Sequence, residues 1–201
     1  MGEIGLKKYS VVIFAAGMGK RLGSLGKRNP KCLLKINDST LIEIITKKLF
    51  SFGAEEITII LGYKAEKIIK HIKKQKIKKI KFIKIKDYNK NGHAFTWYEF
   101  NKYWKKNSKP VLFCHADICF DNNFLKNIIK SPKKNIIGVR KISKEKLRSD
   151  SLVIKAGYKN DLIDIDYNYR IINPNGEIIG INKISKKTKK NIYKFMKKIF
   201  K

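Results

Sequence analysis

The chain has 201 residues, 43 % of them hydrophobic, which is enough for one domain with a single buried core and argues against a second independent domain. Lys and Arg number 47 against 16 Asp and Glu, a formal net charge of +31, yet only five of the basic residues are Arg. Because base readout and phosphate clamps favour Arg, we expect no nucleic-acid partner, although the diffuse charge would attract a polyanionic small substrate.

The cysteines and the N-terminal segment indicate the expected compartment. Cys32, Cys114 and Cys119 form no C-x-x-C pair, and their odd number argues against a disulfide framework. The N-terminus is charged, and no stretch approaches about 18 uninterrupted apolar residues. We therefore expect a soluble, cytoplasmic protein without membrane insertion, and the sequence contains no signal for an oligomeric state.

Apolar and amphipathic segments alternate along the first two thirds of the chain. Five apolar runs predict strands, at 9–15, 56–62, 79–85, 110–116 and 135–141, and apolar residues at helical spacing predict helices between them, at 40–53, 65–75, 93–106 and 121–131. Thr40 and Glu43 have capping-box spacing, and Gly53 marks a helix end. This order predicts a doubly wound α/β fold with a mostly parallel sheet and helices on both faces.

The pattern changes beyond residue 150 to short alternating pieces. A turn signal, Asn-Pro-Asn-Gly, stands at 173–176, so we expect a small antiparallel addition to the sheet. The last stretch, 184–201, puts Ile192, Met196 and Ile199 on one helical face with Lys on the other. Such a helix suits either an anionic membrane surface or the closing position of the domain, and we favour the second. We treat residues 1–201 as a single domain.

A loop of small residues follows the first predicted strand. Ligands of doubly wound sheets sit beyond the carboxyl ends of the strands, and exposed backbone N–H groups in such a loop can hold phosphate. The loop is no Walker motif, because Arg21 follows Gly19-Lys20 where Ser or Thr is needed, and no dinucleotide fingerprint, because Leu22 stands where the third Gly is needed. What remains is G-x-G-x-R, followed ten residues later by Lys31 after Pro30.

This segment, AAGMGKRLGSLGKRNPKCLLKI at 15–36, resembles the signature of the nucleotidyltransferases that act on sugar phosphates and related small phosphates. The nearest likeness is to choline-phosphate cytidylyltransferases and their relatives acting on phosphonates or other phospho-alcohols. The resemblance begins at residue 10 and extends more loosely to about residue 182. It implies the Rossmann-like nucleotidyltransferase fold for the chain.

The resemblance also implies roles for residues of the loop. Ala15, Ala16 and Gly17, with Gly19 in the same loop, would cradle the nucleotide through the backbone. Arg21 would hold the β and γ phosphates, and Lys31 would bridge the reacting phosphates. These residue types suit transfer at an α-phosphorus, because fixed cations and N–H donors stabilise charge on the equatorial and leaving oxygens.

A second segment, VLFCHADICF at 111–120, resembles the family's strand end in which an Asp binds Mg²⁺. The matching residue is Asp117, a carboxylate suited to this hard ion, and the structural alternative is that Asp117 caps the following turn. We expect His115 to face the core or a neighbour, and Asp121 to be the N-cap of the next helix.

Three further segments complete the site that the resemblance implies. NGHAF, at 91–95, resembles the segment that reads the nucleobase, with Asn91, Gly92 and Ala94 as its candidates, although a plain helix start explains them almost as well. Gly62 and Tyr63, at another strand end, are placed to line the nucleotide pocket.

The third segment, NGEIIGINKIS at 175–185, resembles the G-E-x-I-G stretch of the phosphonate and phospho-alcohol enzymes. It makes Glu177 and Gly180 candidates for the acceptor side. The family usually completes its metal site with a later Asp, and no Asp or Glu follows Glu177 here. Three explanations stay open: the usual C-terminal end is missing, Asp164 or Asp166 substitutes although a solvated strand face explains them better, or the enzyme is weakened.

The resemblance therefore implies a Mg²⁺-dependent transfer of a cytidylyl group from CTP to the phosphate of a small acceptor, with release of pyrophosphate. The expected partners are a nucleoside triphosphate and a small phosphorylated acceptor, and the product would serve the decoration of surface polysaccharide or lipid. The alternatives are a sugar-1-phosphate enzyme that uses UTP, dTTP or GTP, and a non-catalytic nucleotide-binding module.

Overall fold

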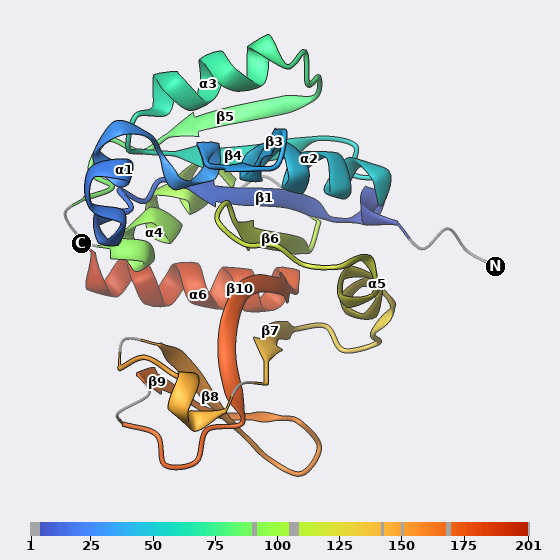
Figure 1. Ribbon diagram of the computed structural model, residues 1–201. Coiled ribbons are helices and arrows are strands. Elements are labelled where there is room, and N and C mark those ends of the chain that lie inside the picture. The colour runs from blue at the N-terminus through green and yellow to red at the C-terminus, as the bar shows by residue number, and fades with distance from the viewer. Residues whose placement is uncertain are drawn as a thin grey trace. The chain divides into compact units, whose positions relative to one another are not determined.

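The computed structural model describes residues 5–89, 92–104, 109–141, 143–149, 151–167 and 170–200 (Figure 1). The chain divides into two compact units. The first comprises Met1–Ile136 together with Lys183–Lys201, and the second comprises Ile137–Asn182. Each unit is described by itself below.

The first unit contains four parallel strands in the order β5-β4-β1-β6. These strands are β1 (Ser10–Ala15), β4 (Ile57–Leu61), β5 (Ile80–Lys84) and β6 (Val111–His115). Helices α2 (Leu41–Ser51), α3 (Ala65–Lys74), α4 (Gly92–Trp104) and α5 (Asn122–Lys130) lie between or after them in the chain. The predicted alternation of parallel strands and helices is confirmed, with most boundaries within two residues.

Both faces of β1, β4 and β6 are buried: successive side chains of a strand point to opposite sides, and nearly all of those in these three strands are inaccessible to solvent. Val12 and Phe14 of β1 face one side, where they join a core cluster with Phe100 of α4. The ring of Phe14 lies 4.9 Å from that of Trp97, centroid to centroid. On the other side the alternate residues of β1 and β4 are equally buried. The continuous apolar runs of the sequence are thus explained by a sheet that is covered on both faces.

Helix α2 begins at the predicted capping box. The side chain of Thr40 accepts from the backbone of Glu43, and Glu43 Oε2 accepts from the Thr40 N–H at 3.0 Å. The second oxygen of this buried carboxylate lies 2.7 Å from His71 Nε2 of α3. The cap therefore also joins α2 to α3. Gly53, with φ of 83°, lies just after the helix, as predicted.

Several short elements were not predicted from the sequence. They are the 3₁₀ helices η1 (Leu6–Lys8), η2 (Lys20–Leu22), η3 (Lys31–Leu33) and η4 (Lys144–Lys146), helix α1 (Gly23–Arg28), and the antiparallel pair β2 (Lys35–Ile36) and β3 (Ser39–Thr40). All are shorter than two helical turns or a normal strand, so their residues show no periodicity. Four of them, η2, α1, η3 and β2, follow the glycine loop directly.

Helix α6 (Lys186–Ile199) packs on α4 within the first unit. The rings of Tyr98 and Tyr193 are stacked with centroids 6.1 Å apart, and Phe95 meets Phe200 edge to face at 5.5 Å. The prediction of a closing helix is confirmed by these contacts. Among the described residues, no helix has the length and apolar character needed to cross a membrane.

The second unit holds the predicted antiparallel addition. Strand β8 (Leu152–Ala156) pairs antiparallel with both β9 (Leu162–Tyr167) and β10 (Gly176–Ile184), and β7 (Ile136–Arg140) also pairs with β10. The run at 135–141 therefore forms a strand, as predicted, but among the described strands it pairs with β10 and with none of the four parallel ones. Periodicity identifies a strand and does not identify its partner.

We predict that Thr40→Ala lowers the melting temperature by about 2–4 °C, because loss of an N-cap costs about 1 kcal/mol in a chain of this size. The measurement is thermal unfolding followed by circular dichroism. Ser24→Ala, an exposed serine of α1, is the matched control and leaves the midpoint unchanged. Equal midpoints for the two variants would contradict a stabilising cap.

Candidate active site

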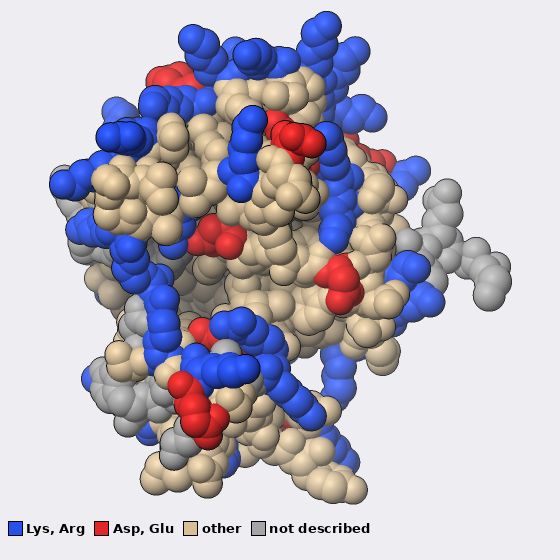
Figure 2. All heavy atoms as spheres, viewed as in Figure 1, with Lys and Arg blue, Asp and Glu red and all other residues tan. Residues whose placement is uncertain are grey.

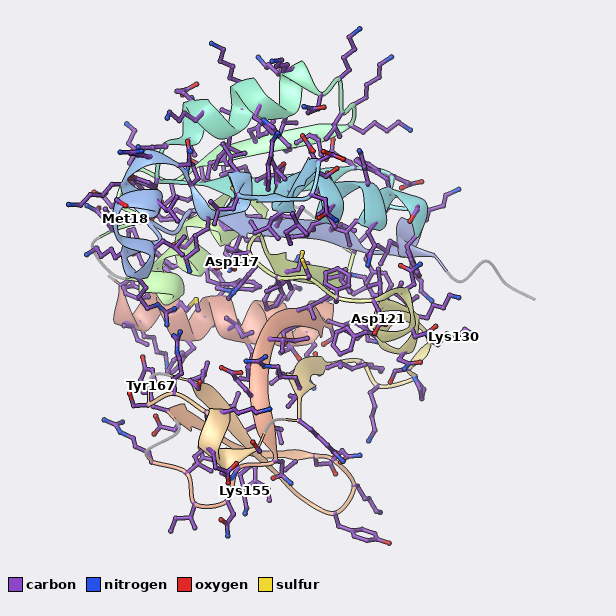
Figure 3. The ribbon with its side chains drawn as sticks, in the orientation of Figure 1. Met18, Asp117, Asp121, Lys130, Lys155 and Tyr167 are labelled. Carbon is purple, nitrogen blue, oxygen red and sulfur yellow. The ribbon has the colours of Figure 1, made fainter. Side chains whose placement is uncertain are left out.

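The order of the parallel strands marks one place for a ligand. Strand β1 pairs with β4 on one side and with β6 on the other, so the chain's winding direction reverses at β1. Crevices outside the carboxyl ends of strands at such a point are the usual ligand sites of this architecture. Ala16 follows β1 and Asp117 lies two residues after β6. Figure 3 shows Met18, of the glycine loop, and Asp117 at this same end of the sheet.

The glycine loop leaves part of its backbone open. Ala15 and Ala16 are buried at the exit of β1, whereas Gly17 is exposed, and a Cβ atom built on Gly17 would meet no atom within 4 Å. Packing therefore does not require glycine at position 17. The absence of a side chain instead leaves the main chain accessible to a close ligand, as the predicted cradle needs.

The next glycine of the loop is required by its conformation and by a neighbour. Gly19 has φ of 63°, and a Cβ there would lie 2.9 Å from Lys31 Cγ. The Lys31 side chain thus passes directly over Gly19. Lys31 itself begins η3 after Pro30, so a turn twelve residues downstream folds back onto the loop.

Lys31 and Asp117 form an ion pair across the end of the sheet. Lys31 Nζ lies 3.3 Å from Asp117 Oδ2, and the two side chains are 27 % and 38 % exposed. A pair this exposed contributes only about 0–1 kcal/mol to stability. The ion pair matters for the arrangement of the site, because it brings together two predicted catalytic residues that are 86 positions apart in the chain. Asp117 therefore reaches Lys31, and capping of a turn does not account for this contact.

Arg21 lies in η2, between the two positive-φ glycines Gly19 and Gly23, and its side chain is exposed. Arg21 comes shortly after Gly17, the residue of the glycine loop whose main chain is accessible. Its predicted contact with the β and γ phosphates remains a prediction.

Neither buried thiol near the site can act as a nucleophile at neutral pH. Burial raises the pKa of Cys32 to about 12, with a smaller contribution in the same direction from the charge of Asp117 and an opposing one from a backbone hydrogen bond. Burial alone raises the pKa of Cys114 to about 12. The thiolate is the reactive form, so both side chains stay inert.

The segment after the glycine loop is held by residues that follow β4. Helix α1 ends at Arg28, and the carbonyl groups of Lys27 and Arg28 point at the start of α3. Tyr63 Oη donates to the Lys27 carbonyl at 3.1 Å, Lys64 Nζ donates to both carbonyls, and Lys67 Nζ donates to that of Arg28 at 3.0 Å. Cations at a helix C-terminus are favourably placed. We call Tyr63, Lys64 and Lys67 the α1 clasp.

The sequence did not identify Lys64 and Lys67 of the α1 clasp, because in a chain this rich in lysine no local pattern distinguishes one lysine from another. Tyr63 was predicted to line the nucleotide pocket, and its described hydrogen bond instead goes to the α1 carbonyl. Gly62 beside it has a packing reason to be glycine: a Cβ would lie 2.4 Å from Tyr88 Cγ and 2.8 Å from the Ala16 oxygen. The pocket-lining role of both residues remains a prediction.

The residues present fit a Mg²⁺ ion shared with a nucleotide. The described residues contain no cluster of three or more His, Cys, Asp or Glu that could form a metal cage by itself. Mg²⁺ commonly takes one or two carboxylates together with phosphate oxygens and water. Asp117, partly exposed at the carboxyl end of β6, is such a carboxylate.

For two residues near Asp117 in the chain, Asp121 and His115, we predicted structural positions. Asp121 Oδ1 accepts from the Phe124 N–H at 2.6 Å, which confirms it as the N-cap of α5. His115 is half-buried at the end of β6, beside Phe14 of β1.

The predicted acceptor residues lie in the second unit. Both oxygens of Glu177 are engaged there: Oε2 accepts from Arg140 Nε at 2.7 Å, and Oε1 accepts from Ser151 Oγ at 2.7 Å. Gly180 has φ of 76° within β10. Of the candidates for base recognition, Asn91 lies outside the described residues, and Gly92 and Ala94 lie in the first turn of α4, where only the backbone is described.

Asp164 and Asp166 of β9 bind their own strand. The Oδ1 atom of each accepts from the N–H of the next residue at 2.7 Å, and Asp166 also lies 3.5 Å from Arg170. Asp164 is exposed and Asp166 is half-buried. This arrangement agrees with the predicted solvated strand face.

Comparison with known proteins identifies the family. The model of the family described as nucleotidyl transferase matches residues 10–163. The chain belongs to the nucleotidyl transferase family. This match covers the glycine loop, Lys31 and Asp117.

Individual relatives include cytidylyltransferases. The CTP:phosphoglutamine cytidylyltransferase of Campylobacter jejuni is 27 % identical over 135 residues, 66 % of this chain and 53 % of that protein. The 2-aminoethylphosphonate cytidylyltransferase of Lancefieldella rimae is 37 % identical over 60 residues, 30 % of this chain and 24 % of that protein. The matches thus span about half or less of these curated relatives.

A solved structure shares the fold. The CTP:phosphocholine cytidylyltransferase of Streptococcus pneumoniae superposes with a TM-score of 0.72 at 22 % identity, covering 96 % of this chain and 77 % of that one. The predicted Rossmann-like nucleotidyltransferase fold is confirmed.

We predict that Lys64→Met speeds amide hydrogen exchange in residues 23–29 about tenfold, because it removes charged donors from the carbonyl groups that end α1. Exchange is measured by mass spectrometry on the nucleotide-free protein. Lys70→Met, an exposed substitution on the same helix, is the control. Identical exchange in the two variants would mean that the clasp does not order this segment.

Proposed function

We propose that this nucleotidyl transferase moves a cytidylyl group from CTP to the phosphate or phosphonate of a small acceptor and releases pyrophosphate. The observation that carries the proposal is the contact of Lys31 with both Gly19 and Asp117. The Lys31 side chain lies over Gly19, in the loop that would hold the phosphates, and beside Asp117, the carboxylate that would hold Mg²⁺. A bound triphosphate needs the loop, the cation and the carboxylate at one place. The cytidylyltransferases among the relatives support CTP as the nucleotide.

In this mechanism an oxygen of the acceptor attacks the α-phosphorus of CTP in line. A bond forms between that oxygen and phosphorus while the bond to the β-phosphate oxygen breaks, and pyrophosphate leaves. Negative charge grows on the leaving oxygen and the equatorial oxygens. Lys31 and Arg21 supply fixed positive charge, and the N–H groups around Gly17 supply donors. Because the acceptor's own oxygen is the nucleophile, no enzyme-bound intermediate is needed.

Asp117 is the residue that would hold Mg²⁺ beside the phosphates. The ion supplies charge neutralisation of the triphosphate and of the leaving pyrophosphate. Lys31 pairs with Asp117 in the structure. Asp117 would hold the ion, and Lys31 beside it would contact the phosphates.

We further propose that residues 1–201 act as one nucleotidyltransferase domain, in which the second unit contributes to acceptor recognition. Glu177 holds the guanidinium of Arg140, whose side chain remains 58 % exposed. An Arg held in this way is preorganised for a phosphate or phosphonate group. Glu177 therefore acts on the acceptor through Arg140, and Gly180 lies on the same strand.

The test is a matrix of pyrophosphate release with CTP, UTP, dTTP and GTP against phosphocholine, 2-aminoethylphosphonate and glucose 1-phosphate. We expect release only when CTP, a phospho-alcohol or phosphonate acceptor and Mg²⁺ are all present. Lys31→Ala and Arg21→Ala lower turnover about 100-fold or more, because both residues act on charge that grows in the transition state. Lys70→Ala, with the same change of charge on α3, keeps native turnover. Release with glucose 1-phosphate alone, or nucleotide binding without release, would contradict the proposal.

Gly17→Ala separates ligand contact from folding. A Cβ at this position meets no atom of the protein, so the melting temperature stays within about 1 °C of native. If the main chain at Gly17 lies against the nucleotide, the added methyl group weakens CTP binding at least tenfold by calorimetry. Native CTP affinity in this variant would place the nucleotide elsewhere.

A further inference from the structure

Helix α2 contacts both chain segments that carry the Lys31–Asp117 pair. At its first residue, the Leu41 N–H donates at 3.0 Å to the carbonyl group of the residue that ends η3, the element that begins with Lys31. In its last turn, Lys48 Nζ donates to the Phe120 carbonyl, in the loop that contains Asp117. About 10 Å along the helix axis separates the two attachments. The two segments are therefore joined through one helix as well as through their ion pair.

Helix α2 is a rigid support for these contacts. On its buried face, Ile42, Ile45 and Leu49 are at most 1 % exposed. Its first turn is closed by the capping box, and the carboxylate of that box also contacts His71 of α3. A helix with a close-packed apolar face and a capped end moves little relative to the core. Groups that are bound to α2 are therefore held in place relative to the core.

Lys48 contacts Phe120 in two ways. Its ammonium group donates to the Phe120 carbonyl and lies 5.2 Å from the centroid of the Phe120 ring. Both residues are half-buried. Shielding from water strengthens a cation–π contact and a hydrogen bond from a charged donor. Lys48 thus holds both the main chain and the side chain of one residue in the loop.

The loop between β6 and α5 carries Asp117 between anchored points. At its start the Ala116 N–H donates to the Phe14 carbonyl of β1 at 3.0 Å, and at its end Asp121 caps α5. Between these points the Asp117 side chain is 38 % exposed, so packing alone does not fix its direction. The residue that Lys48 holds follows Asp117 by three positions. Lys48 therefore limits the arrangements that this part of the loop can take.

A neighbouring lysine separates this contact from a general effect of charge. A cation in the last turn of a helix stabilises the helix dipole wherever its side chain points. Lys47 is exposed and directly precedes Lys48 on α2. Among the contacts of the described residues, Lys47 has no hydrogen bond to the loop after β6. Substitution of each lysine in turn therefore distinguishes charge at the helix end from attachment of the loop.

We propose that Lys48 is a positioning residue for Asp117. From α2 it holds Phe120, and this contact keeps the loop in the arrangement in which Asp117 faces Lys31. Lys48 acts through the loop and not on the phosphates. The inference rests on the proposed function, in which Asp117 holds Mg²⁺ beside the triphosphate.

The first test is amide hydrogen exchange of residues 117–120 in the metal-free and nucleotide-free protein. Lys48→Met keeps most of the apolar stem of the side chain and removes its charge and its donor. We expect about tenfold faster exchange in this variant, because a hydrogen bond from a charged group to the loop is lost. Lys47→Met, the matched control, leaves the exchange unchanged. Equal exchange in the two variants would overturn the proposal.

The second test is calorimetry of CTP binding in the presence of Mg²⁺. If only a fraction of the molecules holds Asp117 in place, the apparent affinity falls by that fraction. We expect Lys48→Met to weaken binding about fivefold and Lys47→Met to leave it unchanged. Lys48→Arg restores most of the affinity, because a guanidinium group can still donate to the carbonyl and lie over the ring. In turnover, the loss in Lys48→Met raises the KM for Mg²⁺–CTP and leaves kcat near native.

Asp117→Ala separates failure of this inference from failure of the proposed function. We expect this variant to lose the Mg²⁺-dependent part of CTP binding. Native binding in Asp117→Ala would overturn the proposed role of Asp117, and the inference with it. Loss of binding in Asp117→Ala together with native binding in Lys48→Met would overturn the inference alone.

Discussion

The site depends on the parallel pairing of β1 with two neighbours at once. Val12 of β1 lies beside Thr58 of β4 and beside Phe113 of β6. Because all three strands run in the same direction, their carboxyl ends meet at one edge, and the loop after β1 comes to lie beside the residues after β6. Burial of both faces of β1 fixes this pairing. If β1 slipped by one residue, the side chains that now pack under α4 would point to the other face of the sheet, and those of the other face would point toward α4. The contact of Lys31 with Asp117 follows from it.

The first unit uses the two ends of the same sheet differently. At the carboxyl ends the backbone is open at Gly17 and the Lys31 side chain passes over Gly19, which suits a polyanion. At the amino ends a hollow of about 390 Å³ borders the core cluster. The arrangement at the carboxyl ends is what the proposed nucleotidyl transfer needs.

The strong positive charge of the chain is spread over many lysines, and a few of them hold the segment after the glycine loop in place. Figure 2 shows Lys and Arg over the whole visible face, gathered most densely over α3 at the top. Most project into solvent. Lys31 pairs with the carboxylate of Asp117 at the carboxyl ends of the parallel strands, and Lys64 and Lys67 donate to the carbonyl groups that end α1. What distinguishes these three lysines is their place beside the loops at the carboxyl ends of the parallel strands.

The sequence by itself determined the four parallel strands and the helices α2 to α6 of the first unit, the caps at Thr40 and Asp121, and the resemblance to the family, because these depend on residues that are close in the chain. The G-x-G-x-R loop, Lys31 and Asp117 were each identifiable from local pattern and resemblance. Only the tertiary structure decided that Lys31 meets Asp117, that the α1 clasp exists, that β7 pairs with β10 and that a hollow opens beside Ser10. These are contacts between distant segments, and a local pattern records which element forms but not which element it packs against.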